Sequence, residues 1–180
     1  VNSNVKAVPK KPISTKDIQR LLKLDSAQRD ESDLFHLGAY SGLRLIALTN
    51  LKWSNVDLEN GTIRVLTDKG LRDADGVQLP LHPNNTQRLS QRAKIKCDSG
   101  SYVFDLGGDR EVGLRSSFWS RRMSKFLKAN AVELGFHSLR HSVVTRLAEL
   151  GVQEQHRKAI VRHSLGSDVH NRVYHHGYPV

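Results

Sequence analysis

The sequence has 180 residues, a formal net charge of +10 and one cysteine, Cys97. This length suffices for one domain with a buried core, and a hydrophobic fraction of 38% excludes wholesale disorder. The excess of lysine and arginine favours a polyanionic partner. The single cysteine excludes an intrachain disulfide and is typical of a reducing intracellular setting. No apolar stretch is long enough to cross a membrane.

Residues 1–12 are polar and basic and contain two prolines, so we expect a linker or basic arm there. Residues 13–180 are expected to form one domain. The sequence begins with Val1 rather than methionine, so we expect the chain to be a fragment of a longer protein.

The first helix is expected directly after residue 13. Ser14 followed by Asp17 resembles a capping box with the shorter acid. Ile18, Leu21 and Leu22 then recur with helical spacing, which predicts one buried face.

A second helix is expected around Leu34 and Leu37, and it should stop near Gly42. Residues 43–51 predict a further helical segment. Arg44 therefore falls at a helix start directly after a glycine turn, where backbone N–H groups favour an anion.

A small antiparallel sheet is expected in the middle of the chain. Apolar and polar residues alternate over 56–58 and 63–65, and Asn60-Gly61 between them predicts a type I′ hairpin turn. A third strand is expected at 77–81, after a polar loop.

Helical periodicity returns in the second half, at 86–96, 116–128 and 153–161, with a further helix whose leucine-rich face ends at Gly151. That face holds Leu139, Val143, Leu147 and Leu150. The apolar stripe of the second of these helices predicts core packing rather than a ligand site, and consists of Trp119, Met123, Phe126 and Leu127. The sequence thus predicts an α+β fold, mostly helical with one three-stranded antiparallel sheet.

Three residues lie in patterns that suit cleavage of a DNA strand: Arg44, Arg140 and Tyr174. Two fixed guanidinium groups can bind the non-bridging oxygens of a phosphodiester, and a tyrosine hydroxyl can attack phosphorus. His137 lies three residues before Arg140, so both share a helix face. The alternatives are a buried ion pair of Arg44 with an aspartate and a surface Arg140 bonded to a carbonyl.

Three further residues complete the candidate site. Lys69 can protonate a leaving oxygen, although a solvated loop lysine is the commoner reading. His163 can donate a hydrogen bond to phosphate or cap a helix. Tyr174 can be ordinary packing, and Tyr40 and Tyr178 are rival nucleophiles.

No cofactor and no metal is expected. His170, His175 and His176 cluster near the C-terminus, but no cysteine or carboxylate lies near them with ligand spacing. The Gly107-Gly108 pair lacks the lysine and hydroxyl pattern of a phosphate-binding loop.

Taken together, these segments resemble the catalytic domain of the tyrosine recombinases, the phage integrase family, with its mostly helical fold. The first arginine box of that family is matched by the run from Tyr40 to Leu45, and its His-x-x-Arg box by His137 to His141. The resemblance assigns the hairpin lysine to Lys69, the later histidine to His163 and the nucleophile to Tyr174.

Three departures from the family pattern are visible. Ala47 stands where the family usually places an acid three residues after the first arginine. Val161-Arg162-His163 replaces the usual Leu-Gly-His, and the loop after Lys69 is longer than the compact family hairpin.

The resemblance implies a division of roles. Arg44 and Arg140 would hold the scissile phosphate, and Tyr174 would form a 3′-phosphotyrosyl intermediate. Lys69 would protonate the leaving 5′ oxygen, His137 would act as acid or base, and His163 would bond the phosphate. The implied function is site-specific recombination for integration or excision of a phage or mobile element.

The resemblance also implies partners. These are double-stranded DNA and three further copies of the chain in a tetramer on DNA, with a monomer when isolated and with room for accessory DNA-bending proteins. The expected location is the cytoplasm of a bacterium, at the nucleoid. Amino-terminal DNA-binding domains of such integrases do not fit within 180 residues.

Two alternatives stay open at this point. A type IB topoisomerase uses similar chemistry to relax DNA, although the integrase boxes fit better. A non-catalytic DNA-binding relative is the other alternative, and Ala47 is its only sequence support.

Overall fold

The computed structural model describes residues 11–24, 30–65, 76–95, 97–105 and 112–161. Its elements, in chain order, are α1 (Thr15–Leu22), α2 (Asp30–Ser41), α3 (Leu45–Thr49), η1 (Trp53–Asn55), β1 (Val56–Asp57), β2 (Thr62–Val65), β3 (Val77–Pro80), α4 (Pro83–Ile95), α5 (Val112–Ala129), α6 (His137–Glu149) and α7 (Glu154–Ile160). The predicted α+β class is confirmed.

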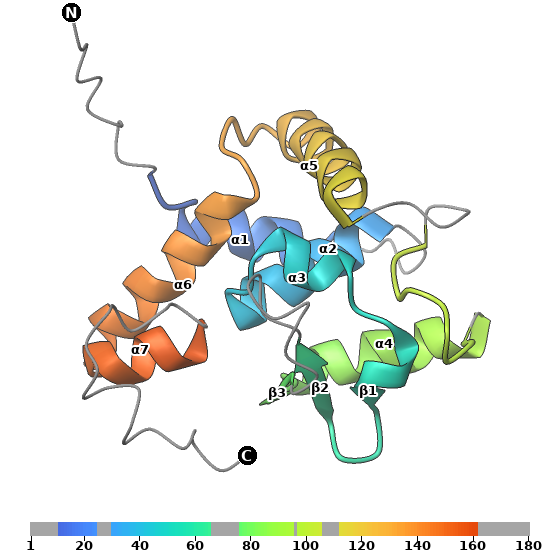
Figure 1. The fold of residues 1–180 in the computed structure, drawn as a ribbon. Coiled ribbons are helices and arrows are strands. Elements are labelled where there is room, and N and C mark those ends of the chain that lie inside the picture. The colour runs from blue at the N-terminus through green and yellow to red at the C-terminus, as the bar shows by residue number, and fades with distance from the viewer. Residues whose placement is uncertain (1–10, 25–29, 66–75, 96, 106–111, 162–180) are drawn as a thin grey trace, which may run out of the picture.

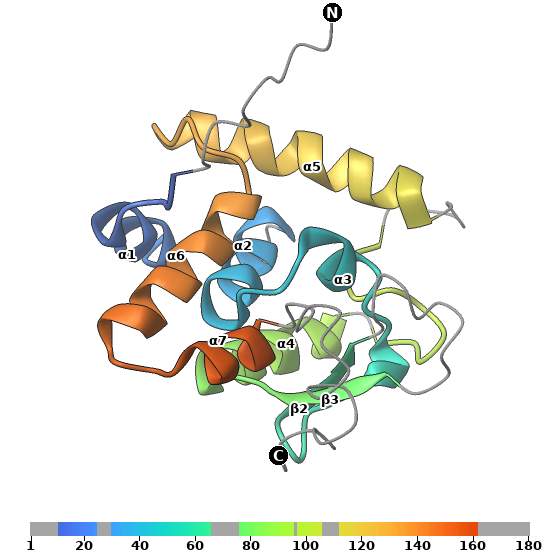
Figure 2. The same cartoon turned by 60° about the vertical axis from the view of Figure 1, so that its left-hand side comes forward.

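Helix α2 lies in the middle of the molecule and packs against α1, α3, α4, α5 and α6. Figures 1 and 2 show α5 on one side of α2, with the sheet and α4 on the other side. Because α2 is covered all round, its polar residues Ser32, Asp33 and His36 are buried together with Leu34 and Phe35. Buried polar groups of this kind need partners, and these partners shape the rest of the fold.

The predicted start of α1 is confirmed. The Asp17 backbone N–H donates to Ser14 Oγ at 3.1 Å, which satisfies one of the free donors at the helix start. Hydrogen bonds from Ser14 and Arg20 lower the pKa of the Asp17 carboxyl below its ordinary value. Leu21 is fully buried, as its helical spacing predicted.

The three-stranded antiparallel sheet is also confirmed, in the order β1-β2-β3. Val56 pairs with Ile63, and Ile63 pairs in turn with Leu79. The type I′ turn is wrong, however, because such a turn needs a positive φ at both central residues and only Gly61 has one, at 62°. The Asp57 carboxylate accepts from the backbone N–H and from the side-chain amide of Asn60, and this closes a longer connection.

The later helices differ from the prediction mainly at their ends. Helix α4 begins at Pro83, three residues early, because proline suits a first helical turn. The predicted apolar face of α6 fails at its last position, since Leu150 is 63% exposed while Leu139 is buried. Gly151 ends α6 with a φ of 76°, as expected.

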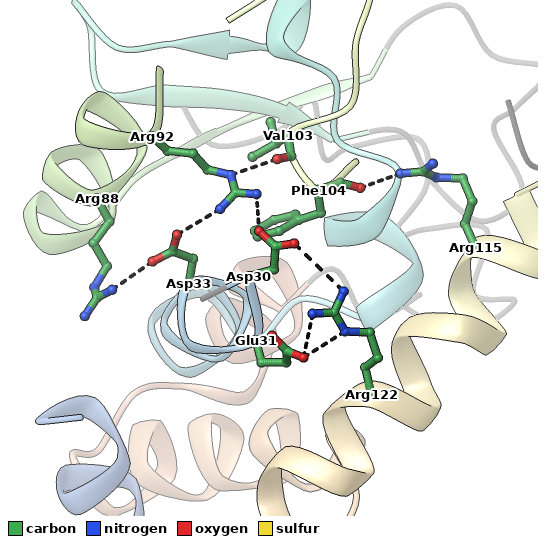
Figure 3. Close-up of polar contacts among 9 residues, drawn as sticks. All are labelled: Asp30, Glu31, Asp33, Arg88, Arg92, Val103, Phe104, Arg115 and Arg122. Carbon is green, nitrogen blue, oxygen red and sulfur yellow. Dashed lines mark hydrogen bonds and ion pairs between the residues drawn. The ribbon is translucent and has the colours of Figure 1, made fainter. Parts of the chain in front are cut away.

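A network of ion pairs joins α2 to α4 (Figure 3). Asp33 is buried and accepts from Arg88 Nη1 at 2.8 Å and from Arg92 Nη1 at 3.1 Å. Arg92 also pairs with Asp30 and donates from Nε to the Val103 carbonyl at 2.8 Å. Burial raises the pKa of the Asp33 carboxyl, while both arginines act to lower it. These arginines therefore serve the fold rather than a ligand.

Two arginines of α5 extend this arrangement (Figure 3). Arg122 donates from Nε to Glu31 Oε1 at 2.7 Å, which ties α5 to the start of α2. Arg115 is fully buried and donates from Nη2 to the carbonyls of Thr49, at 3.1 Å, and Phe104, at 2.7 Å. A substantial part of the chain's positive charge is thus used inside the molecule.

From the surroundings of His36 we expect the free energy of unfolding to fall at acidic pH. It is 5% exposed, neither ring nitrogen forms a hydrogen bond of good geometry within the described residues, and burial together with the Arg88 charge lowers its pKa to about 4. The unfolded chain, with a histidine pKa of about 6.5, binds the proton first. The contribution of His36 to the free energy of unfolding is therefore fully present above about pH 6.5. It is lost, by about 3 kcal/mol, as the pH drops to about 4.

The measurement is urea unfolding from pH 7.5 to 4.5 for the parent chain and for His36→Leu. The variant should lose less stability across this range, because it carries no titrating group at that position. An equal pH dependence in both chains would contradict the assignment to His36.

Within the described ranges, every helix is too short or too polar to cross a membrane.

Candidate functional site

The described residues include half of the predicted site: Arg44, His137 and Arg140. The other predicted site residues lie outside the described ranges: Lys69, His163 and Tyr174.

Arg140 joins three segments that are far apart in the sequence. Its side chain is buried, at 5% exposure, and Nη1 donates to the Gly42 carbonyl at 3.0 Å and to the Val161 carbonyl. Gly42 lies in the turn between α2 and α3, and Val161 directly follows α7. Arg140 is therefore not a surface arginine, as the alternative had it. The bond to a carbonyl that the same alternative predicted is present.

This contact brings together the segments that carry Arg44 and Arg140. Arg44 lies two residues after Gly42, Arg140 lies in the first turns of α6, and the predicted His163 follows Val161 by two residues. In both views the ends of α2 and α7 lie beside α6 (Figures 1 and 2). The fold thus assembles the turn before Arg44, the His-x-x-Arg helix and Val161 at the end of α7 around one guanidinium group.

Gly42 allows this close approach. Its φ is 65°, and a Cβ at this position would lie 2.8 Å from Val161 Cγ1 and 3.1 Å from Val143 Cγ1. Glycine is the residue that adopts such a backbone without strain and leaves room for α6 and the end of α7.

We therefore expect Gly42→Ala to lower the free energy of unfolding by about 2 kcal/mol, from backbone strain and from the contact with Val161. Thermal unfolding will measure the loss. Gly151→Ala is the matched control, because Gly151 also has a positive φ, 76°, but its Cβ would meet nothing within 4 Å. Equal losses in both variants would contradict the role of close packing at Gly42.

Arg44 is the residue before α3 and has an extended backbone, with φ −68° and ψ 145°. Its side chain is half-buried, and its carbonyl accepts from the Ala47 N–H at 3.0 Å. The expected helix over 43–51 is thus only the five-residue α3, with Arg44 at its start as predicted. Ser41 closes the preceding helix, since Oγ donates to the Leu37 carbonyl at 2.5 Å and accepts from the Leu43 N–H at 3.2 Å.

His137 begins α6 and is exposed. Its ring meets the ring of His141 edge to face, with centroids 5.0 Å apart and planes at 78°. The predicted acid or base role of His137 stays a prediction, since exposure at a helix start does not by itself establish proton transfer.

Ala47 is half-buried and packs against the core at the start of α3. It lies one helical turn after Arg44, whose carbonyl accepts its N–H.

Tyr40, the rival nucleophile, has an established set of contacts. Its hydroxyl oxygen accepts from Asn84 Nδ2 at 2.9 Å, and its ring stacks on that of His82. His82 and Asn84 carry no sequence motif that would have indicated a role, because they simply follow a strand at the start of α4. Only the fold brings them to the end of α2.

An open groove of about 610 Å³ lies between the β1–β2 connection, the end of β3 and α4. Its lining includes Glu59, Gln87 and Ser90, but no arginine, lysine, histidine or tyrosine. The lining of this groove therefore lacks the side chains that phosphodiester chemistry needs.

No three histidine, cysteine or acidic side chains of the described ranges are grouped to hold a metal ion. The C-terminal histidines lie outside these ranges.

A sequence model of the phage integrase family matches residues 11–179. Among curated proteins, the chain is 27% identical over 157 residues to the tyrosine recombinase XerA of Thermococcus kodakarensis, covering 86% of this chain and 54% of that protein. It is 23% identical over 150 residues to XerA of Pyrococcus furiosus, covering 82% and 51%. The chain spans about half the length of these curated relatives.

Solved structures show the same fold. A XerA recombinase crystal structure has a TM-score of 0.69 at 22% identity, covering 88% of this chain and 56% of that one. The integrase from mycobacterium phage Brujita has a TM-score of 0.68 at 25% identity, covering 87% and 50%. A lambda integrase tetramer bound to a Holliday junction has a TM-score of 0.66 at 16% identity, covering 95% and 50%. With a family match over nearly its whole length, the chain belongs to the phage integrase family.

Proposed function

We propose that this chain is the catalytic part of a tyrosine recombinase that performs site-specific recombination of DNA. The observation that carries this proposal is the Arg140 guanidinium, which donates to the Gly42 carbonyl, two residues before Arg44, and to the Val161 carbonyl after α7. In this proposal Arg44, directly before α3, and Arg140, in α6, bind the same phosphate. Family membership supports the same activity.

The arginines act on charge. As the phosphorus passes from four to five oxygen ligands, negative charge grows on its non-bridging oxygens. Arg44 and Arg140 donate hydrogen bonds to these oxygens and stabilise the transition state more than the ground state. Their guanidinium groups stay charged throughout, so neither arginine transfers a proton.

Tyr174 acts as the nucleophile. Its phenolic oxygen bonds to phosphorus while the bond from phosphorus to the 5′ oxygen breaks, and a 3′-phosphotyrosyl ester forms. The tyrosine proton passes to a base, for which His137 is the candidate, and Lys69 supplies a proton to the 5′ oxygen. His163 donates a hydrogen bond to the phosphate.

Rejoining reverses these steps. A 5′-hydroxyl from a partner strand attacks the phosphotyrosyl ester and releases Tyr174, so the number of phosphodiester bonds is unchanged. The energy of the broken bond is held in the ester, and the reaction requires no nucleotide hydrolysis.

Recombination cuts two strands at each of two sites, so we propose that four copies act together on double-stranded DNA. The tetramer named in the lambda integrase structure supports this arrangement for a relative of the same fold. Accessory proteins that bend DNA are compatible with the proposal, and the isolated chain is proposed to be a monomer.

The experiment uses a nicked duplex that traps the covalent intermediate, carrying a target site selected by binding from a random library. The parent chain should form a protein–DNA adduct on a denaturing gel, and Tyr174→Phe should form none while still binding the duplex. Tyr178→Phe is the matched control and should form the adduct normally. An adduct that survives Tyr174→Phe would contradict the assigned nucleophile.

Ala47→Glu addresses the departure from the family pattern. A rise in adduct yield would mean that Ala47 limits the activity of this chain, because the added carboxylate would orient Arg44. Binding without any adduct in the parent chain and in Ala47→Glu would favour the non-catalytic DNA-binding function. Relaxation of supercoiled DNA irrespective of sequence would favour the topoisomerase activity.

A further inference from the structure

Three polar side chains form a cluster at the end of α2, and we name it the Tyr40 cluster: Tyr40, His82 and Asn84. Tyr40 is half-buried, whereas His82 and Asn84 are exposed. The rings of Tyr40 and His82 stack with centroids 4.0 Å apart and planes at 16°. Asn84 donates from Nδ2 to Tyr40 Oη at 2.9 Å and from its backbone N–H to His82 Nδ1 at 3.2 Å.

These bonds determine which hydrogens the cluster presents. Tyr40 Oη accepts from Asn84, so its own O–H remains a donor. His82 Nδ1 accepts a backbone N–H, so the neutral ring carries its hydrogen on Nε2. The cluster therefore presents two donors, one O–H and one N–H, on neighbouring rings held parallel to each other.

Donors of this kind suit an anion that only accepts hydrogen bonds. None of the three members carries a carboxylate. Arg88, the cation of α4 that acts on nearby His36, is already paired with Asp33. A phosphodiester oxygen would supply two acceptor lone pairs without requiring the cluster to change its internal bonds.

The position of the Tyr40 cluster indicates that this anion is a phosphate of bound DNA. Tyr40 lies in the last turn of α2, two residues before Gly42 and four before Arg44. His82 lies between β3 and α4, and Asn84 is the second residue of α4. The cluster thus connects the turn between α2 and α3, which leads to Arg44, with the segment after β3. That strand follows the loop of the predicted Lys69.

We propose that the Tyr40 hydroxyl and the His82 Nε2–H bind a backbone phosphate of the bound duplex, next to the phosphate that is cut. This inference rests on the proposed function and adds a second phosphate contact to it. Such a contact fixes the register of the duplex relative to Arg44 and Arg140 but reads no base.

The other explanation is purely structural, because the ring stack also connects α2 to the start of α4. Tyr40→Phe separates the two explanations, since it keeps the ring and its stack on His82 but removes the hydroxyl. His82→Phe likewise keeps an aromatic ring and removes the Nε2 donor. Tyr102→Phe is the matched control, because Tyr102 lies beside Arg115 and Lys52, away from this cluster.

The experiment measures binding of the full chain to a fluorescently labelled 30-base-pair duplex at one fixed salt concentration. Because hydrogen bonds to a charged group contribute more than neutral ones, Tyr40→Phe and His82→Phe should each weaken binding by about tenfold. Tyr102→Phe should bind as the parent chain does. Thermal unfolding of all four chains shows whether a variant is folded at the assay temperature.

Side-chain nitrogen NMR gives a readout that a structural role would not move. Titration of the same duplex into the parent chain should shift the His82 Nε2 resonance until binding saturates. Parent-like binding in Tyr40→Phe and His82→Phe, or an unmoved Nε2 resonance, would overturn this inference and leave the proposed function standing. A parent chain that binds no duplex would overturn both.

Discussion

Arg140→Ala should reduce formation of the covalent DNA adduct by about 10²–10³-fold, which is typical of removing one donor to a transition state. The guanidinium lies between the Gly42 and Val161 carbonyls, so its loss also frees the turn of Arg44. The measurement is the initial rate of adduct formation on the nicked duplex, made at a temperature where each variant is folded.

Two variants test this explanation. Arg146→Ala is the matched control, because Arg146 lies in the same helix, is exposed and pairs with the exposed Glu149 at 3.0 Å. It should form the adduct at the parent rate. Arg140→Lys keeps the charge but lacks the planar fork, so it should recover only a small part of the activity. An Arg140→Ala rate within threefold of the parent would exclude Arg140 from the chemistry.

Asp33→Ala should lower the free energy of unfolding by about 3–5 kcal/mol, the usual range when one partner of a buried ion pair is removed. Asp33 is buried and pairs with Arg88 and Arg92 (Figure 3). Without Asp33, Arg88 would lose the carboxylate with which it pairs, and Asp30 would be the remaining acidic partner of Arg92 in this network. Two cations would then lie near each other beside α2.

Urea unfolding at pH 7 will measure this loss, as a shift in midpoint at an unchanged slope. Glu149→Ala is the control, because the exposed pair of Glu149 with Arg146 should contribute less than about 1 kcal/mol. A loss below about 1 kcal/mol for Asp33→Ala would contradict the structural role of this network.

The network also bears on the charge of the chain. A net charge of +10 suggests a DNA-binding surface, but Arg88, Arg92 and Arg122 are paired with acids of α2. Among the described residues, the cations that remain exposed on α5 include Arg121, Lys125 and Lys128. Composition therefore overstates the number of arginines that are available for DNA.

The sequence by itself was sufficient for features that depend on local spacing. Helical periodicity predicted the core positions of Leu21, Trp119 and Met123, because residues one turn apart share a face whatever packs on it. Ser14 capped the first helix through a bond to Asp17 only three residues away. The helical and strand periodicities along the chain sufficed to predict the α+β class for the same reason.

Features that depend on distant neighbours required the tertiary structure. The Asp57 side chain, not the Asn60-Gly61 pair alone, determined the hairpin connection. Leu150 follows the helical pattern but is 63% exposed, because the described part of the chain leaves this side chain largely uncovered.

The candidate site shows the same division. Arg44 and Arg140 could be selected from their local patterns, but the burial of Arg140 arises from carbonyls 98 and 21 residues away. His82 reaches Tyr40 only because β3 and α4 pack beside α2, and no sequence spacing encodes that contact. Local spacing is set by backbone geometry and can be read along the chain, whereas long-range contacts form only when the core brings its elements together.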